Sequence, residues 1–509
     1  MSPADDPRER FKRPLERPGA NLPVPARPQP TPEPVKEEAG GGGLARLLNA
    51  VAKMLQPKPA DQAPAQPTRD PASEPALYTV LVAAMNGDNA DGAASLALYK
   101  ILDAHPTLKV KPLPRPFQLD NLEDLAQATG LQTNARHALA DENADLLVWG
   151  DVGKDGYRLR LTTITPPDEE RAGTFGLSTR IELPLALSDT QSALLQAACL
   201  AAGEAQTEVQ RAAVRRLLPA AASPLEAAVA KPPVSWSMGQ QRSLLFVYGH
   251  VCAVCGQVVA PSQAGEWFQK AVSAYKAAEK RLGRTDPAWE SALIHKALAA
   301  ALTVWAERSK DQARDLLEQA VPQWRMAGEG LNRATMPQEW AAAQTRLGVA
   351  LYRLDLLTGD TELLRESIQV LQAALQVHTK AEYPQRWADL MNVIAQVLEV
   401  YGDQLKNPAV LQRAIDACHL VLEVRTRERT PLAWAATRNT LGSTLFLMDR
   451  HGGGIDHLTE AEQVLSEALE VFTQHGAKGP AQVAARNLAH VRKLAEERRG
   501  RAVIDPGWN

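Results

Sequence analysis

The chain has 509 residues, long enough for roughly two to four domains with sizeable cores. Its 56 Lys and Arg residues nearly balance 59 Asp and Glu residues, so the net charge of -3 gives no reason to expect nucleic acid or an anionic membrane as the main partner. Four cysteines are too few and too unevenly spaced for a disulfide framework, which favours a reducing compartment, and we expect the cytoplasm.

Residues 1–75 are rich in proline and contain a run of four glycines at 40–43. Such a composition buries too little apolar surface to offset the loss of chain entropy, so this segment is predicted to be a disordered tail. The opening residues, MSPADDPRERFKRP, have no apolar core after their charges, and no apolar run in the chain reaches the roughly 18 to 20 residues of a bilayer span. We therefore expect neither an export signal nor a transmembrane helix.

One stretch of the tail, residues 44–57, has the periodicity of an amphipathic helix and is predicted to be a docking helix. Apolar residues fall at offsets 0, 3, 4, 7 and 11, and these are Leu44, Leu47, Leu48, Val51 and Leu55. The sequence leaves three targets open for it: the folded part of the same chain, a groove on a partner protein, or a membrane surface. Two cations on so short a helix make only a weak membrane anchor.

Residues 76–188 alternate between strand-like and helix-like segments, which predicts an α/β domain. The expected strands and helices cover, in chain order, 77–85 (strand), 91–104 (helix), 108–113 (strand), 121–144 (one broken or two short helices), 145–152, 157–164 and part of 176–185 (strands). Asp-Gly between two strand-like runs, at Asp155 and Gly156, is a strong hairpin signal. The order β-α-β-α-β-β-β predicts a small mixed sheet with helices packed on it.

The stretch ADLLVWGDVGKDGYRLRLTTI, Ala144 to Ile164, carries a family resemblance. It is similar to the Ala-Asp, apolar run, Gly-x-Val, Asp-Gly and Leu-Arg-Leu pattern of the TolB-type N-terminal α/β domain, which in bacteria is often fused to tetratricopeptide repeats. The resemblance implies a module for recognition or assembly and does not imply catalysis. The run GDVGK at 150–154 is not expected to bind phosphate, because its glycines lie in a hairpin turn and no helix N-terminus follows.

Further along the chain the motif Pro-x-x-Trp recurs at a fixed spacing. Trp340, Trp387 and Trp434 are each 47 residues apart, and Trp289 lies 51 residues before Trp340. A fixed period of this length is typical of stacked supersecondary units. The sequence therefore predicts a helical repeat.

Each of these tryptophans is predicted to open a helix and to staple neighbouring units. Proline suits the first helical turn because its missing N–H would be unpaired there, and Asp286 and Thr430, directly before a proline, are expected to cap their helices. Coupling in such arrays is between nearest neighbours, so Trp387→Ala is expected to cost roughly 3 to 5 kcal/mol of stability.

A second helix follows in each unit, and small residues mark where the two helices approach closely. Three pairs of small residues are each 19 apart: Gly348 with Ser367, Ala395 with Ala414, and Gly442 with Ala461. This pattern resembles the tetratricopeptide repeat (TPR), although the units here span about 47 residues against 34 in that family. We expect an Ala-rich helix and linker over 189–235, a TPR-like α-solenoid of about five helix pairs plus a polar cap over 236–500, and a short tail over 501–509.

The sequence offers no recognisable catalytic or metal-binding constellation, so we expect no enzyme and no cofactor. The cluster of His250, Cys252 and Cys255 lacks the second pair of ligands that a zinc site needs. It also falls inside a predicted helix, whereas a redox Cys-x-x-Cys pair usually opens one. These cysteines are expected in the core.

The first helices of TPR-like arrays line a concave face, where extended peptides or partner helices bind. Aligning the predicted first helices places five polar residues on that strip: Thr345, Asn392, Gln396, Asn439 and Ser443. Their side chains can hydrogen-bond a peptide backbone, or they can be merely solvated. If they bind, changing Asn392 and Asn439 together to alanine is expected to weaken partner binding roughly ten-fold or more and to leave folding intact.

The predicted fold is therefore multidomain: a disordered tail, a small α/β domain and an all-α solenoid. The function expected is a non-enzymatic cytoplasmic scaffold or adaptor whose partners are other proteins or peptides and not nucleic acid. The alternative is a sensor or regulatory subunit, in which the α/β domain binds a small ligand and the repeats relay its presence to a partner.

Overall fold

The computed structural model describes residues 76–504 except for residues 90, 123, 310 and 453–454. The expected tail over 1–75 and its docking helix lie outside the described residues. By their internal contacts the described residues form two compact units, 76–343 and 344–504, and this division falls within a single helix, α12 (Pro337–Thr358). The domain boundaries expected near residues 188 and 235 stay predictions.

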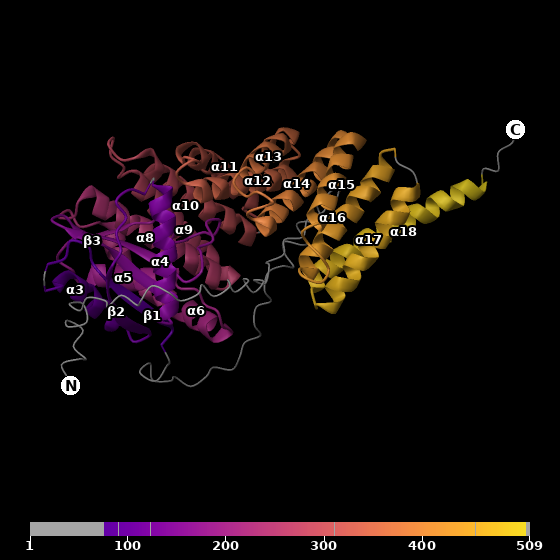
Figure 1. The fold of residues 1–509 in the computed structure, drawn as a ribbon. Helices are drawn as coiled ribbons and strands as arrows, with labels where there is room; N and C mark the ends of the chain where they lie inside the picture. The colour runs from indigo at the N-terminus through magenta and orange to yellow at the C-terminus, as the bar shows by residue number, and fades with distance from the viewer. Residues whose placement is uncertain (1–75, 90, 123, 310, 453–454, 505–509) are drawn as a thin grey trace. The chain divides into compact units, whose positions relative to one another are not determined.

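A five-stranded mixed sheet forms the N-terminal part of the first unit (Figure 1). Its strands lie in the order β2-β1-β3-β4-β5. They are β1 (Tyr78–Ala84), β2 (Leu108–Pro116), β3 (Leu146–Gly153), β4 (Gly156–Thr163) and β5 (Ile181–Leu183). β1 is parallel to β2 and β3, whereas β4 is antiparallel to both β3 and β5. The predicted order of strands and helices along the chain, the mixed sheet and the Asp-Gly hairpin are confirmed.

Helices pack on both faces of this sheet. α3 (Ala93–Asp103) connects β1 to β2, and α4 (Leu125–Asp141) connects β2 to β3 in the opposite direction across the sheet, so right-handed crossovers place the two helices on opposite faces. α5 (Asp189–Ala202) contacts α3 and therefore shares its face. α4 is one continuous helix, not the broken pair expected, because Asp124 caps its start by accepting from the backbone N–H of Gln127 and its one glycine costs only about 1 kcal/mol.

The region expected as one Ala-rich helix and a linker is more helical than predicted. After α5 come α6 (Glu208–Ala222), η3 (Ser223–Leu225) and α7 (Glu226–Ala230). Capping boxes begin α5 at Ser188 and α6 at Thr207. The Ser/Thr-x-x-Gln spacing of these two boxes was the sequence signal for two separate helices.

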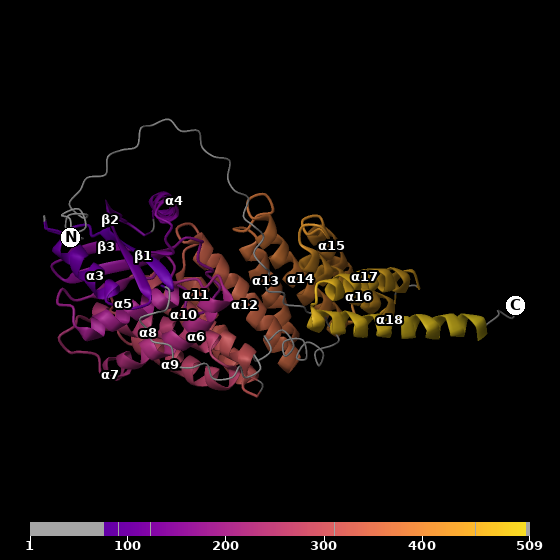
Figure 2. The ribbon, with the colours of Figure 1, turned by 90° about the horizontal axis from the view of Figure 1, so that it is seen from below.

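From Met238 onward the described chain is helical and forms five helix pairs followed by a final helix (Figures 1 and 2). The helices after α7 are α8 (Met238–Val258), α9 (Pro261–Glu279), α10 (Ala288–Arg308), α11 (Ala313–Gly330), α12, α13 (Thr361–Ala374), α14 (Pro384–Leu405), α15 (Pro408–Leu422), α16 (Pro431–Arg450), α17 (Ile455–Gln474) and α18 (Lys478–Ile504). A small mixed sheet followed by a helical-repeat solenoid is thus confirmed, and the final helix extends beyond the predicted end of the cap. None of the helices in the described part combines the length and the apolar character needed to span a membrane.

Small residues bring the two helices of a pair together, as predicted. Ser367 Oγ donates a hydrogen bond to the backbone oxygen of Gly348 at 2.7 Å. A Cβ atom on Gly348 would lie 2.5 Å from Leu371 Cγ, and one on Gly442 would lie 2.5 Å from Leu465 Cγ. Any larger side chain at either glycine would push its pair of helices apart.

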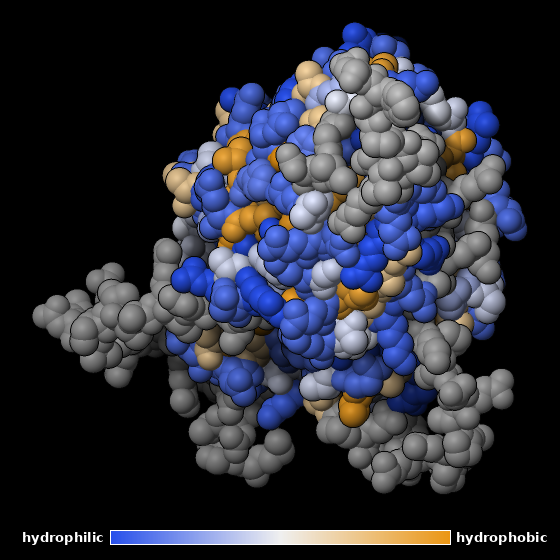
Figure 3. Space-filling view, turned by 90° about the vertical axis from the view of Figure 1, so that its right-hand side faces the viewer, coloured by the Kyte–Doolittle hydropathy of each residue, from blue (hydrophilic) through white to orange (hydrophobic). Residues whose placement is uncertain are grey.

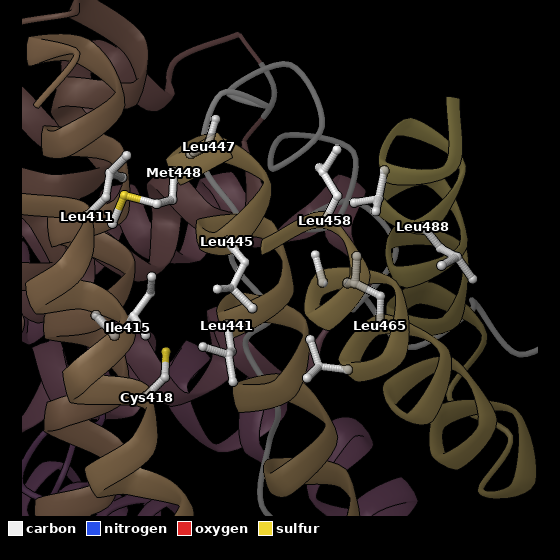
Figure 4. Packing of buried hydrophobic residues seen from close by; sticks show 14 of the residues in the cluster. Leu411, Ile415, Cys418, Leu441, Leu445, Leu447, Met448, Leu458, Leu465 and Leu488 are labelled. Atoms are coloured by element: carbon white, nitrogen blue, oxygen red, sulfur yellow. The ribbon is translucent and has the colours of Figure 1, made fainter. Parts of the chain in front are cut away.

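The core of the second unit is built from leucines at these contacts (Figure 4). Leu441 and Leu445 of α16 lie between the apolar side chains of α15 and α17, and Leu488 of α18 extends the same cluster. The two α16 leucines follow Trp434 by 7 and 11 residues, a spacing that places them on one face of the helix. Cys418 joins this cluster, and all four cysteines are buried and free, which confirms the predicted core role of Cys252 and Cys255.

The two side-chain caps expected beside the prolines are wrong. Thr430 precedes α16 but makes no capping hydrogen bond, and Pro287, not Asp286, is the N-cap residue of α10. The Asp286 carboxylate instead accepts from the backbone N–H of Gly283 at 2.7 Å and pairs with Arg242 at 2.5 Å. Prolines do occupy the first turn of α14 and α16, as predicted.

The repeated tryptophans are half-buried, and Trp434 packs against an apolar cluster that α16, α17 and α18 share, as a residue that staples neighbouring units would. A cation seven residues earlier covers the ring in three of the four copies: Arg333 over Trp340, Lys380 over Trp387 and Arg427 over Trp434, with 5.7, 5.0 and 5.8 Å to the ring centroid. The fixed spacing of this cation before Trp340, Trp387 and Trp434 is visible in the sequence, but the cation was not among the predicted features.

In two copies the same cation also reaches the second helix of its pair. Lys380 pairs with Glu423 at the end of α15 at 2.6 Å, and Arg427 pairs with Glu470 of α17 at 2.9 Å. We term the set of cation, tryptophan and glutamate a tryptophan clamp. It ties the loop before a helix pair to both helices of that pair.

Candidate functional site

The structure buries the five residues that were predicted to line an open concave strip. Their exposed fractions are 7% for Thr345, 5% for Asn392, 6% for Gln396, 2% for Asn439 and 3% for Ser443. The expectation that these are open groove residues is therefore wrong, because neighbouring helices cover them. Their role in partner binding stays a prediction.

Two of the five link successive first helices. Asn392 Oδ1 on α14 accepts a hydrogen bond from Thr437 Oγ1 on α16 at 3.0 Å. Asn439 Oδ1 on α16 accepts one from Asn487 Nδ2 on α18 at 3.1 Å. Both asparagines face the next first helix, and the alignment could not reveal how closely that helix approaches.

Two polar groups of this strip lack a partner. Gln396 Nε2 and Asn487 Oδ1 are buried, and neither has a hydrogen bond within the part of the chain that the structure describes. Leaving such a group unpaired costs about 1 to 3 kcal/mol. Unsatisfied groups that persist at this cost call for an explanation, and a role in binding is one.

In the first unit, a segment of the chain itself lies against the first helices. Residues 169–180, here termed the inner segment, lead from β4 towards β5. Gly173 has φ +75°, and a Cβ atom on it would lie 2.6 Å from the backbone oxygen of His250 in α8. The backbone of the inner segment therefore lies directly on α8, at a place that only glycine fits.

Side chains from three consecutive first helices hold the inner segment. Gln257 Nε2 of α8 donates a hydrogen bond to the backbone oxygen of Ala172 at 2.7 Å. Lys296 of α10 pairs with Glu169 at 2.5 Å. The side chain of Ser178 hydrogen-bonds to Glu339 in the first turn of α12. The first helices thus bind a segment of irregular chain, which contains turns, through hydrogen bonds to its backbone and several polar side-chain contacts.

His250 takes part in this packing, and the neighbouring Cys252 lies buried in the same helix. The His250 ring packs edge-on against Phe175 of the inner segment at 5.1 Å between centroids, and burial lowers its pKa to about 4. Burial raises the pKa of Cys252 to about 12, so its thiol stays protonated near neutral pH. Within the described residues, no group of three or more His, Cys, Asp and Glu side chains is placed to hold a metal ion.

The first unit also contains a cavity of about 330 Å³, here termed the arginine pocket. Its walls are the loop 119–122 after β2, Asp151 at the end of β3, three arginines on β4 and before β5, and the start of α10. The cavity lies outside the carboxyl ends of parallel strands, where ligands of open α/β sheets generally bind. Sequence analysis did not identify this site.

The three arginines are Arg158, Arg160 and Arg180. Arg180 is neutralised, because it pairs with Glu182 at 2.7 Å and with Glu290 at 3.0 Å. Arg160 is 7% exposed, and its Nε donates to the backbone oxygen of Leu177 at 3.1 Å. Burial and the charge of Arg180 lower the pKa of Arg160 to about 10.

The sequence signal for this site was the alternation Arg-Leu-Arg in β4. Residues two apart in a strand point to the same face, so Arg158 and Arg160 had to lie side by side. In the sequence alone, the Arg-Leu-Arg run indicated only the family resemblance. The remaining walls, from the β2–α4 loop and from α10, come from distant parts of the sequence and carried no signal.

Comparison with known proteins gives no family for this chain. No protein-family model matches the sequence, and no curated protein matches it. Solved structures that resemble it are a yeast Tom70 structure (12% identity, 82% of this chain and 80% of that chain covered, TM-score 0.29), a Rap protein complexed with Competence and Sporulation Factor (15%, 61% and 77%, 0.26), and a circular tandem repeat protein with novel repeat topology (14%, 62% and 87%, 0.26). At these TM-scores the likenesses carry no argument about function.

Proposed function

We propose that the chain is a non-enzymatic scaffold that binds a segment of another protein or a peptide along its first helices. The observation that carries the proposal is the inner segment, a stretch of irregular chain that the side chains of α8, α10 and α12 hold. A helix surface that hydrogen-bonds one polypeptide backbone offers the same chemistry to another. In the first unit this surface is filled by the chain itself, so we assign partner binding to the second unit.

The polar strip of the second unit supports this assignment. Gln396 Nε2 is a buried donor without an acceptor, and Asn487 Oδ1 is a buried acceptor without a donor. A polypeptide backbone supplies both kinds of group. Because the strip is buried, binding is coupled to a local displacement of the neighbouring side chains.

One face of the molecule favours polar recognition. On the face that Figure 3 shows, hydrophilic residues predominate and hydrophobic ones form small separate groups. A broad apolar patch is the usual mark of an apolar docking surface. The four free cysteines support the further proposal of a reducing, cytoplasmic location, and the small mixed sheet with its Asp-Gly hairpin supports a TolB-like assignment for residues 76–188.

The proposal is tested with short peptides selected from a random display library against the full chain. Their dissociation constants are measured for the wild type, for Gln396→Leu, and for Gln412→Leu as a matched control on the exposed side of α15. We expect Gln396→Leu to weaken binding about ten-fold and Gln412→Leu to have no effect. Equal binding by both variants, or a failure to select any peptide, would contradict the proposal.

A further inference from the structure

We propose that the arginine pocket binds a small molecule with a carboxylate or phosphate group attached to a planar or apolar part. Arg158 and Arg160 would hold the anion, and Trp289 would pack on the rest of the ligand. The site is the kind of small-ligand site that a sensor role for the α/β domain requires. It does not depend on the scaffold function proposed above.

The buried Arg160 carries an unpaired charge. Its Nε is bonded to a backbone oxygen, and its guanidinium carbon lies 5.5 Å from the centroid of the Trp149 ring. No carboxylate forms an ion pair with it among the residues described. A buried charge is costly unless it is paired, and an anion in the cavity that Arg160 lines would pair it.

Arg158, two residues before Arg160 on the same face of β4, is available to bind a ligand. Its side chain is exposed and takes part in no ion pair or hydrogen bond within the described part of the chain. Two adjacent guanidinium groups can bind the oxygens of one carboxylate or phosphate through several charge-assisted hydrogen bonds. A third cation would not be available, because Arg180 is already paired twice.

The acidic residues of the pocket leave this site positive. Asp120 is engaged by the amide groups of Gln118 and Gln127, the latter at 2.9 Å. Asp151 lies opposite Arg158 in the β3–β4 register and is the one carboxylate close enough to raise the pKa of Arg160. One carboxylate against two unpaired arginines leaves an excess positive charge for a ligand to neutralise.

Trp289 differs from the other repeated tryptophans in the surroundings of its ring. Its position seven residues earlier is Leu282, and no cation covers its ring among the described residues. The ring instead lines the pocket together with Leu119 and Leu122. An aromatic ring beside an arginine pair suits a planar ligand with an anionic group, and about 330 Å³ is within the usual range for small-molecule sites.

The experiment uses the full chain with phenyl phosphate and benzoate, which share a ring and differ in the anionic group. The melting temperature is measured at increasing concentrations of each probe, and against sodium chloride at the same ionic strength. Dissociation constants follow by calorimetry for the wild type, for Arg158→Ala and for Lys154→Ala. Lys154 is the matched control, because it is an exposed cation of the same hairpin that does not line the pocket.

We expect at least one probe to raise the melting temperature above the salt control, and the probe that does so identifies the preferred anion. Arg158→Ala should weaken its binding roughly ten-fold or more, as for the loss of charge-assisted hydrogen bonds, and Lys154→Ala should not. Absence of any shift beyond salt would overturn the proposal, as would equal binding by the two variants. No peptide is involved, so failure here is distinct from failure of the scaffold proposal.

Discussion

Single polar residues form contacts between successive first helices of the second unit. Near its C-terminal end, each first helix of the second unit places an aspartate against the next first helix. Asp355 Oδ2 accepts from Gln404 Nε2 at 3.0 Å, Asp403 Oδ1 lies 2.8 Å from His451 Nε2, and Asp449 Oδ2 lies 2.8 Å from Arg498 Nη2. These contacts fix the register of successive first helices without contributing apolar area.

Asp355 makes the stability of the chain depend on pH. Burial raises its pKa to about 6 from an ordinary value of 3.8, so the folded state holds the proton more tightly than the unfolded state does. The resulting stabilisation is complete below about pH 3.8 and is lost as the pH rises through about 6. Relative to the wild type, Asp355→Asn should be more stable at pH 8 by about 1 to 2 kcal/mol and should lose this advantage at pH 4. Urea unfolding at both pH values measures the difference, and an equal difference at the two would contradict the account.

The double change of Asn392 and Asn439 to alanine has a different expected outcome now that both are known to be buried. Each change removes a hydrogen bond between first helices. The amide of Asn487 then loses its partner, whereas Thr437 keeps its contacts with Ala433 and Arg425. The pair should therefore cost about 2 to 4 kcal/mol in urea unfolding, not leave folding intact as the sequence suggested. Gln412→Ala, on the exposed side of α15, is the control and should change the free energy of unfolding by no more than about 0.5 kcal/mol. A double variant as stable as this control would show that the two amides contribute nothing.

At the scale of helices, the tryptophan clamp and the inner segment organise the repeats. The start of each first helix was predictable, because proline and tryptophan recur at a fixed spacing and each marks a local preference. The burial of the tryptophan was not predictable, because it depends on the loop that precedes the helix. A large apolar residue at a helix start can equally be a core residue or the aromatic partner of a cation–π contact.

The clamp changes the stability expected for the Trp387→Ala variant. Its ring is half-buried and loses one cation–π contact with Lys380, so the cost should be about 1 to 2 kcal/mol instead of the 3 to 5 expected for a core tryptophan. Leu398→Ala, at a site only 3% exposed in the same helix, should cost about 3 kcal/mol. Chemical denaturation ranks the two variants, and a larger loss for Trp387→Ala would restore the core interpretation.

The inner segment should loosen when its backbone contact is removed. Gln257→Leu deletes the hydrogen bond to the carbonyl of Ala172, directly after the exposed Arg171. Trypsin should then cleave after Arg171 about two- to ten-fold faster, as the loss of one hydrogen bond predicts. Gln263→Leu on the exposed side of α9 should leave the rate unchanged. Equal cleavage of the two variants would mean that Gln257 does not hold the segment.

For the whole molecule, the fold class followed from the sequence while the candidate sites followed only in part. The alternation of strands and helices and the period of 47 residues are local or repetitive signals, and both were read correctly. The arginine pocket and the position of the inner segment depend on contacts between residues far apart in the chain, such as Arg180 with Glu290. No pattern within one segment encodes such contacts, so they required the structure.

The central claim is that first helices bind a polypeptide segment, and photo-cross-linking tests it most directly. A peptide selected against the full chain is synthesised with a photoreactive residue at its centre, bound, irradiated and mapped by mass spectrometry. The account predicts cross-links on the first helices of the second unit, α14 and α16, and their loss in Gln396→Leu. Cross-links confined to the second helices α15 and α17, or unchanged in that variant, would contradict it.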